Sequence, residues 1–142
     1  MNTMTDTTAA ARGESIHMGS AAPTFLVADV AATARWYAEQ LGFQTAGAFP
    51  DNEPYVYASL QRDGVEIMLL GLSGFQKSDL SELRPSGLWD VYVRMRGVHA
   101  FWESLRDQPF IKRPLAKQNY GDWEFEVRDP NGYVLVFSEL ID

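Results

Sequence analysis

The sequence passes through the same order of predicted elements twice, and this internal repeat limits the fold more than any other feature. Extended segments of the first half are predicted at 24–28, 43–49, 55–61 and 65–70, with one helical pattern at 30–41 after the first of them. Those of the second half are predicted at 89–95, 109–113, 120–128 and 133–140, with a helical face at 98–105. Each half therefore reads β-α-β-β-β. Two copies are too few for a solenoid, so we expect an α+β fold in which two modules form a cupped mixed sheet with the helices outside.

Turn and cap residues separate these segments. Asp29 is a good helix N-cap, and Gly42 is suited to end the first helix. The triplet Arg62-Asp63-Gly64 and the stretch Asp129-Pro130-Asn131-Gly132 each predict a tight turn between two strands.

The domain organisation follows from the repeat. We expect a single domain over residues 21–142, built from modules at 21–72 and 87–142 that a polar linker at 73–86 connects. Residues 1–20 are rich in Thr, Ala, Gly and Ser, and they lack the basic start and apolar run of a signal peptide. This stretch is predicted to be a disordered N-terminal arm.

Charge and cysteine content exclude several functions. The formal net charge of −7 repels phosphate backbones and favours cationic partners, so we expect no nucleic-acid ligand. The chain has no cysteine, which removes thiolate metal sites, disulfides and cysteine nucleophiles. No apolar run reaches the roughly 20 residues that span a bilayer. We therefore expect a cytoplasmic protein that binds no membrane.

Short motifs in both halves resemble those of the vicinal oxygen chelate superfamily, which includes glyoxalase, extradiol dioxygenases and bleomycin-binding proteins. Their order and spacing carry the resemblance, which covers residues 22–139. The motifs are Val27-Ala28-Asp29-Val30, Trp36-Tyr37, the stretch Tyr-Gly-Asp-Trp-Glu-Phe at 120–125 and Arg-Asp-Pro-Asn-Gly at 128–132. Within the superfamily, the sequence is most similar to bleomycin-resistance proteins. This similarity lies at Pro23, at the stretch 88–94 and at Trp102-Glu103, although Trp123 replaces an arginine of their pattern.

The resemblance also implies where a metal would bind. Superfamily enzymes hold a divalent ion with four side chains, and these positions fall on Ala22, Glu66, Asp90 and Val136. Alanine and valine cannot ligate a metal, and two carboxylates are fewer than a catalytic ion generally needs. We therefore expect neither a metal nor another cofactor, and no catalytic residues.

The resemblance instead implies a homodimer with two ligand grooves at the subunit interface. Strand alternation places Glu66 and Met68 on one groove-lining strand and Asp90 and Tyr92 on another. The predicted ligand-binding residues, chosen for their aromatic rings, acidic groups or place on these strands, are Tyr55, Tyr57, Glu66, Met68, Trp89, Asp90, Tyr92, Tyr120, Trp123 and Glu124. Aromatic faces and carboxylates favour a small, cationic aromatic compound such as a bleomycin-type antibiotic, which the protein would sequester.

Two other functions remain open from the sequence. The first is a metal-dependent or carboxylate-based lyase, isomerase or dioxygenase of the same superfamily, in which Glu66 and Asp90 could serve acid–base chemistry. The fold could also serve as a generic small-molecule binder whose ligand is unrelated to antibiotics.

Overall fold

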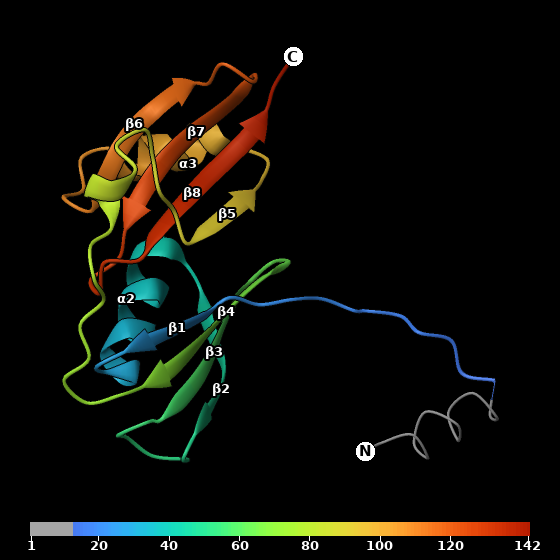
Figure 1. Ribbon diagram of the computed structural model, residues 1–142, viewed down its shortest axis with the longest axis vertical. Coiled ribbons are helices and arrows are strands. Elements are labelled where there is room, and N and C mark those ends of the chain that lie inside the picture. Colours follow the sequence, from blue (N-terminus) through green and yellow to red (C-terminus); the bar gives the residue numbers. More distant parts are fainter. Residues whose placement is uncertain (1–12) are drawn as a thin grey trace.

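The computed structural model describes residues 13–142, which form two modules lying end to end (Figure 1). The first module consists of β1 (Thr24–Val27), α2 (Val30–Leu41), β2 (Gln44–Phe49), β3 (Tyr57–Arg62) and β4 (Val65–Gly71). The second consists of β5 (Val91–Arg94), α3 (Val98–Leu105), β6 (Ile111–Lys117), β7 (Asp122–Arg128) and β8 (Val134–Leu140). A short 3-10 helix, η1 (Ser81–Leu83), lies in the connection between them. The predicted β-α-β-β-β order is confirmed in both halves.

Each module builds a four-stranded sheet of its own. The strand orders are β1-β4-β3-β2 in the first sheet and β5-β8-β7-β6 in the second. In both sheets the first strand pairs in parallel with the last, across the crossover helix, and the other neighbours are antiparallel. Among the described strands none pairs with a strand of the other module. The expected mixed sheet therefore consists of two separate four-stranded sheets.

The helix of each module covers one face of its sheet. Asp29 caps α2 by accepting a hydrogen bond of 3.0 Å from the backbone N–H of Ala32, and Gly42 ends the helix with φ of 72°. Alternate strand residues point toward the helices and form the core. On β4, β5 and β8 the alternation predicts Val65, Ile67, Leu69, Val91, Val93, Leu135 and Phe137 for this face; Val65 and Val91 are half-buried and the other five are buried.

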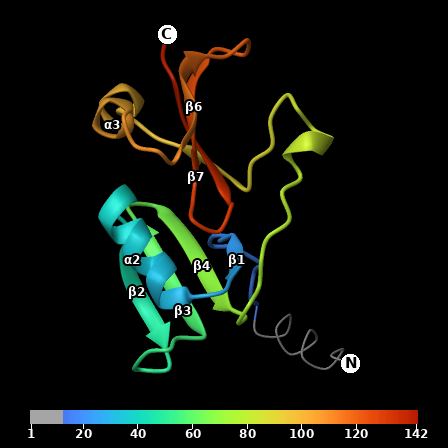
Figure 2. The same cartoon turned by 90° about the vertical axis from the view of Figure 1, so that its left-hand side faces the viewer.

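The sheet faces opposite the helices are here called the open faces. In the second module α3 lies on one side of the sheet and the linker passes on the other (Figure 2). Arg113 of β6 holds the linker there by donating hydrogen bonds of 3.2 Å to the carbonyls of Pro85 and Ser86. The connection predicted from polarity alone therefore lies along the open face of the second sheet.

The two modules contact each other through the turn between β7 and β8. The ring of Tyr133 stacks on Phe25 at 4.0 Å between centroids, and its hydroxyl donates to the carbonyl of Leu26 at 2.7 Å. The side chain of Asn131 donates to the hydroxyl of Thr33 on α2 at 3.0 Å. These contacts connect the β7–β8 turn of the second module to β1 and α2 of the first.

The N-terminal arm is described only from Gly13 onward, so its first 12 residues lie outside the structure's description. Residues 14–23 contain no helix or strand and run away from the first module (Figure 1). Within residues 13–142 no helix combines the length and hydropathy needed to cross a membrane.

Candidate binding site on the open face of the second sheet

Strand β7 carries three acidic side chains on the open face of the second sheet. Asp122, Glu124 and Glu126 occupy alternate positions, and each is only 6% exposed. Of the three, only Glu124 is among the residues predicted to bind the ligand, although strand alternation places the other two on the same face. Burial of three carboxylates on one face is costly unless each is hydrogen-bonded or paired with a cation. Their partners therefore define what the face can bind.

Hydroxyl groups surround two of these carboxylates. The Tyr92 hydroxyl lies 2.9 Å from Oγ of Ser138 and also contacts Oε2 of Glu124. Tyr120 donates to the same Glu124 oxygen at 2.6 Å, and Ser138 donates to Oδ2 of Asp122 at 2.7 Å. The structure thus brings together three predicted residues, Tyr92, Tyr120 and Glu124, in one network.

This network shifts the acidity of its members. Burial, followed by the hydrogen bond to Glu124, raises the pKa of Tyr92 to about 12. The same two causes raise the pKa of Tyr120. The hydrogen bond from Ser138 is the main reason that the pKa of Asp122 is lowered. Both tyrosines are therefore neutral hydrogen-bond donors at neutral pH.

The three carboxylates differ in their cationic partners. Nζ of Lys112 lies 3.2 Å from Glu126, and Nη1 of Arg94 lies 3.4 Å from Asp122. Glu124 forms no ion pair with any of the described residues, and its carboxylate is held by the two tyrosine hydroxyls. Of these three carboxylates, Glu124 is therefore the one whose negative charge is not paired with a cation of the described residues.

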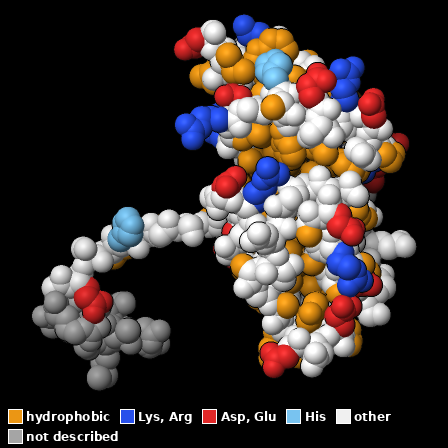
Figure 3. Space-filling model, turned by 180° about the vertical axis from the view of Figure 1, so that it is seen from behind, with side chains coloured by type: hydrophobic (Ala, Val, Ile, Leu, Met, Phe, Trp, Pro, Cys, Tyr) orange, Lys and Arg blue, Asp and Glu red, His pale blue; other side chains and the backbone are white. Residues whose placement is uncertain are grey.

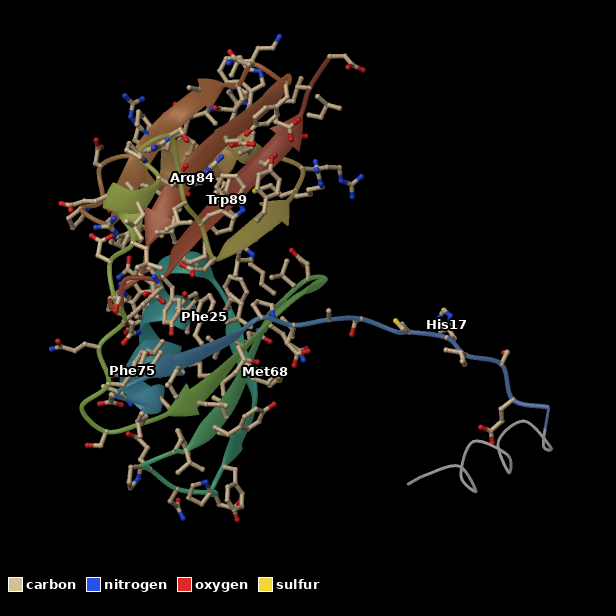
Figure 4. All side chains as sticks on the ribbon, viewed as in Figure 1. His17, Phe25, Met68, Phe75, Arg84 and Trp89 are labelled. Carbon is tan, nitrogen blue, oxygen red and sulfur yellow. The ribbon has the colours of Figure 1, made fainter. Side chains whose placement is uncertain are left out.

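Aromatic rings flank this carboxylate on the solvent side. Trp89 lies over the open face (Figure 4), with its ring centroid 5.7 Å from that of Tyr92. Its side chain is 42% exposed, and Tyr120 is 61% exposed. A cavity of about 250 Å³ is lined by Glu124 and Glu126 of β7 and by neighbouring residues of β6. Exposed rings beside an unpaired carboxylate are suited to bind a cation or a planar cationic ring.

The open face of the first sheet holds three other predicted residues. Tyr57 donates a hydrogen bond of 3.6 Å to Sδ of Met68, and Ser59 donates one of 2.6 Å to Oε2 of Glu66. The face has a polar part around Glu66 and, beside it, an apolar row that includes Tyr57. That row crosses all four strands in register and consists of Leu26, Leu70, Tyr57 and Phe49.

Three predicted groove residues lie elsewhere. Trp123 points to the helix side of the second sheet and packs against His99 of α3, with centroids 4.9 Å apart. This predicted groove residue therefore does not share a face with Glu124, because consecutive strand residues point to opposite faces. Tyr55 packs against the hydrophobic core. Asp90 accepts a hydrogen bond of 2.8 Å from the backbone N–H of Val134 and lies 3.9 Å from Nζ of Lys77.

The residues at the four metal positions do not fit a metal ion. Ala22 and Val136 carry no donor atom, and the residue paired with Val136 across the parallel strands is Tyr92 rather than Asp90. Glu66 and Asp90 are each engaged by hydrogen bonds within their own module. Over residues 13–142 no group of three or more His, Cys, Asp or Glu side chains is arranged to hold a metal.

The sequence matches the model of a known protein family. A model of the glyoxalase/bleomycin resistance protein/dioxygenase superfamily matches residues 17–137, which is most of the chain. The chain belongs to this superfamily. The resemblance drawn from the paired motifs is therefore confirmed. No match was found among curated proteins.

Solved structures of the superfamily share the fold at low identity. A glyoxalase-related enzyme from Clostridium phytofermentans is 16% identical, with a TM-score of 0.69 over 89% of this chain and 98% of that chain. A bleomycin-binding protein complexed with bleomycin is 18% identical, with a TM-score of 0.63 over 86% and 98%. The bleomycin-binding protein of Streptomyces verticillus, complexed with copper(II)-bleomycin, is 19% identical, with a TM-score of 0.60 over 87% and 97%. Enzymes and binding proteins thus use the same two-module architecture.

Proposed function

We propose that this superfamily member is a metal-independent binding protein that sequesters a small, cationic aromatic compound in grooves at a homodimer interface. The carboxylate of Glu124 carries the proposal. It is nearly buried, lies beside exposed aromatic rings and accepts hydrogen bonds from two tyrosines, and it forms no ion pair with the described residues. A ligand cation would supply the missing charge partner.

The chemistry of the open face supports this ligand class. Trp89 and Tyr120 present ring faces, each worth roughly 0.5–2 kcal/mol against a cation or a planar ring. The net charge of −7 adds a long-range attraction that speeds the encounter with a cationic molecule. Bleomycin-type antibiotics combine planar rings with positive charge, and two proteins that share the fold are complexed with bleomycin.

The homodimer is supported by the open face of the first sheet. Its apolar row includes two exposed side chains, Leu70 at 44% and Phe49 at 64% exposure, and none of the described helices covers this face. A second copy that covers this row would bury apolar surface, which is the main driving force of association. It would also turn an open sheet face into the wall of a groove.

Calorimetric titration with bleomycin and related cationic glycopeptides tests the proposal directly. We expect saturable binding with one ligand per groove, unchanged by EDTA and weakened by added salt. Light scattering at micromolar concentration tests the dimer. Absence of binding to all of these compounds at high protein concentration would contradict the proposed ligand class, and a monomer would contradict the interfacial groove.

A further inference from the structure

A second concave site lies between the two modules, away from the open faces. It is a cavity of about 590 Å³ and lies between the β3–β4 turn, the end of β5 and α3. It is here called the waist groove, and its apolar floor consists of Leu41, Phe43, Val65, Met95, Phe101 and Phe137. Figure 3 shows apolar side chains gathered between the two halves with basic side chains beside them. The volume falls in the range of small-molecule sites, about 300–1,000 Å³.

Positive charge is concentrated at the mouth of the waist groove. Three arginines, Arg62, Arg94 and Arg96, line it together with one acidic residue of the described chain, Asp63. Arg94 is paired with Asp122 of the open face, and Nε of Arg62 lies 4.0 Å from Asp63. This local excess occurs in a chain whose net charge is −7. Arg96 forms no hydrogen bond or ion pair with the residues that the structure describes, so its whole charge is open to a ligand.

Arg62 is held in place at the same mouth. Its Nη1 donates a hydrogen bond of 2.7 Å to the carbonyl of Leu41, and its guanidinium lies 5.2 Å from the ring centroid of Phe101. A guanidinium fixed by a backbone carbonyl and an aromatic ring loses little freedom when it meets an anion. The mouth therefore combines one oriented cation with one unpaired cation above an apolar floor.

We propose that the waist groove binds a small molecule with an apolar body and an anionic head, either a carboxylate or a phosphate monoester. The body would occupy the floor, and the head would lie between Arg62 and Arg96. The site differs from the open face of the second sheet in location and in charge, so it does not depend on the function proposed there.

Calorimetric titration with ten-carbon probes tests this ligand class and distinguishes the two heads. Decanoate and decyl phosphate carry the anionic heads, and decanol and decyltrimethylammonium are the neutral and cationic controls. We expect at least one anionic probe to bind with one equivalent per chain and about ten-fold more tightly than decanol. Equal affinity for all four probes, or binding of the cationic probe alone, would overturn the proposal.

Two charge reversals separate a local contact from a general effect of charge. Arg96→Glu lies at the mouth, whereas Arg106→Glu makes the same change of charge at an exposed position outside the groove. We expect Arg96→Glu to weaken binding of the anionic probe about ten-fold or more and Arg106→Glu to change it by less than about two-fold. Equal losses in both variants would overturn the proposal. The proposal would also be overturned if a second copy of the chain fills the groove. In that case no probe would bind, and Arg96→Glu would dissociate an oligomer.

Discussion

The hydroxyl of Tyr37 donates a hydrogen bond of 2.7 Å to Oδ2 of Asp129, which joins α2 of the first module to the β7–β8 turn of the second. Both side chains are buried, at 0% and 4% exposure. The other carboxylate oxygen, Oδ1, accepts the backbone N–H groups of Asn131 at 2.8 Å and Tyr133 at 2.9 Å. One buried carboxylate therefore shapes the turn and fastens it to the other module.

Removal of the Tyr37 hydroxyl is expected to destabilise the fold. In Tyr37→Phe the buried Asp129 carboxylate loses a donor, and the cost of an unmade buried hydrogen bond is about 1–3 kcal/mol of the free energy of unfolding. Urea denaturation measures this loss. Tyr55→Phe is the control, because the Tyr55 hydroxyl has no hydrogen bond with the described residues, and we expect it to change stability by less than about 0.5 kcal/mol. Equal stability of the two variants would contradict the structural role of the bond.

The same carboxylate predicts a pH dependence. Burial raises the pKa of Asp129 above its usual 3.8, so the native state holds this proton more tightly than the unfolded state does. Its contribution to stability is therefore fully present below about pH 3.8 and is lost as the pH rises through the raised value. The measurement is the free energy of unfolding of the wild type minus that of Asp129→Asn, taken from acidic to neutral pH. We expect this difference to fall with rising pH, and a difference that rises would contradict the prediction.

Neutralisation of Glu124 is expected to impair binding of a cationic ligand. Glu124→Gln keeps the shape of the side chain but removes the negative charge beneath Trp89 and Tyr120, and loss of a charge-assisted contact costs about 1.5–3 kcal/mol. We expect bleomycin affinity, measured by calorimetry, to fall by about ten-fold or more. Glu103→Gln removes the same charge from the exposed surface of α3 and serves as the control. If both variants bound alike, the charge of Glu124 would have no part in recognition.

Two tryptophans provide a matched test of which sheet face binds the ligand. Trp89 lies exposed beside Tyr92, whereas Trp123 packs against His99 under α3. Trp89→Ala should weaken bleomycin binding by about 1 kcal/mol with little effect on stability. Trp123→Ala should lower the thermal midpoint and leave the affinity of the folded protein unchanged. The reverse pattern would place the groove on the helix side of the sheet.

Local patterns in the sequence were enough to predict the elements. The helix after Asp29 ends at Gly42 as expected, because a capping carboxylate and a left-handed glycine act within a few residues of the chain. The core positions Ile67 and Leu69 also follow from alternation within one strand. One strand was predicted too short: β6 extends to Lys117, because pairing with β7 continues past Pro114, which lies at the sheet edge.

The sequence by itself determined the two-module order, the turns and the lack of metal ligands at positions 22 and 136, because these depend on residue type and short-range periodicity. Only the tertiary structure decided which side chains meet. It grouped Tyr92, Ser138 and Glu124 from three strands, turned Trp123 toward α3 and brought Tyr37 to Asp129. These outcomes depend on strand register and on how the modules pack, and a shift of one residue in register reverses the face of every side chain on a strand.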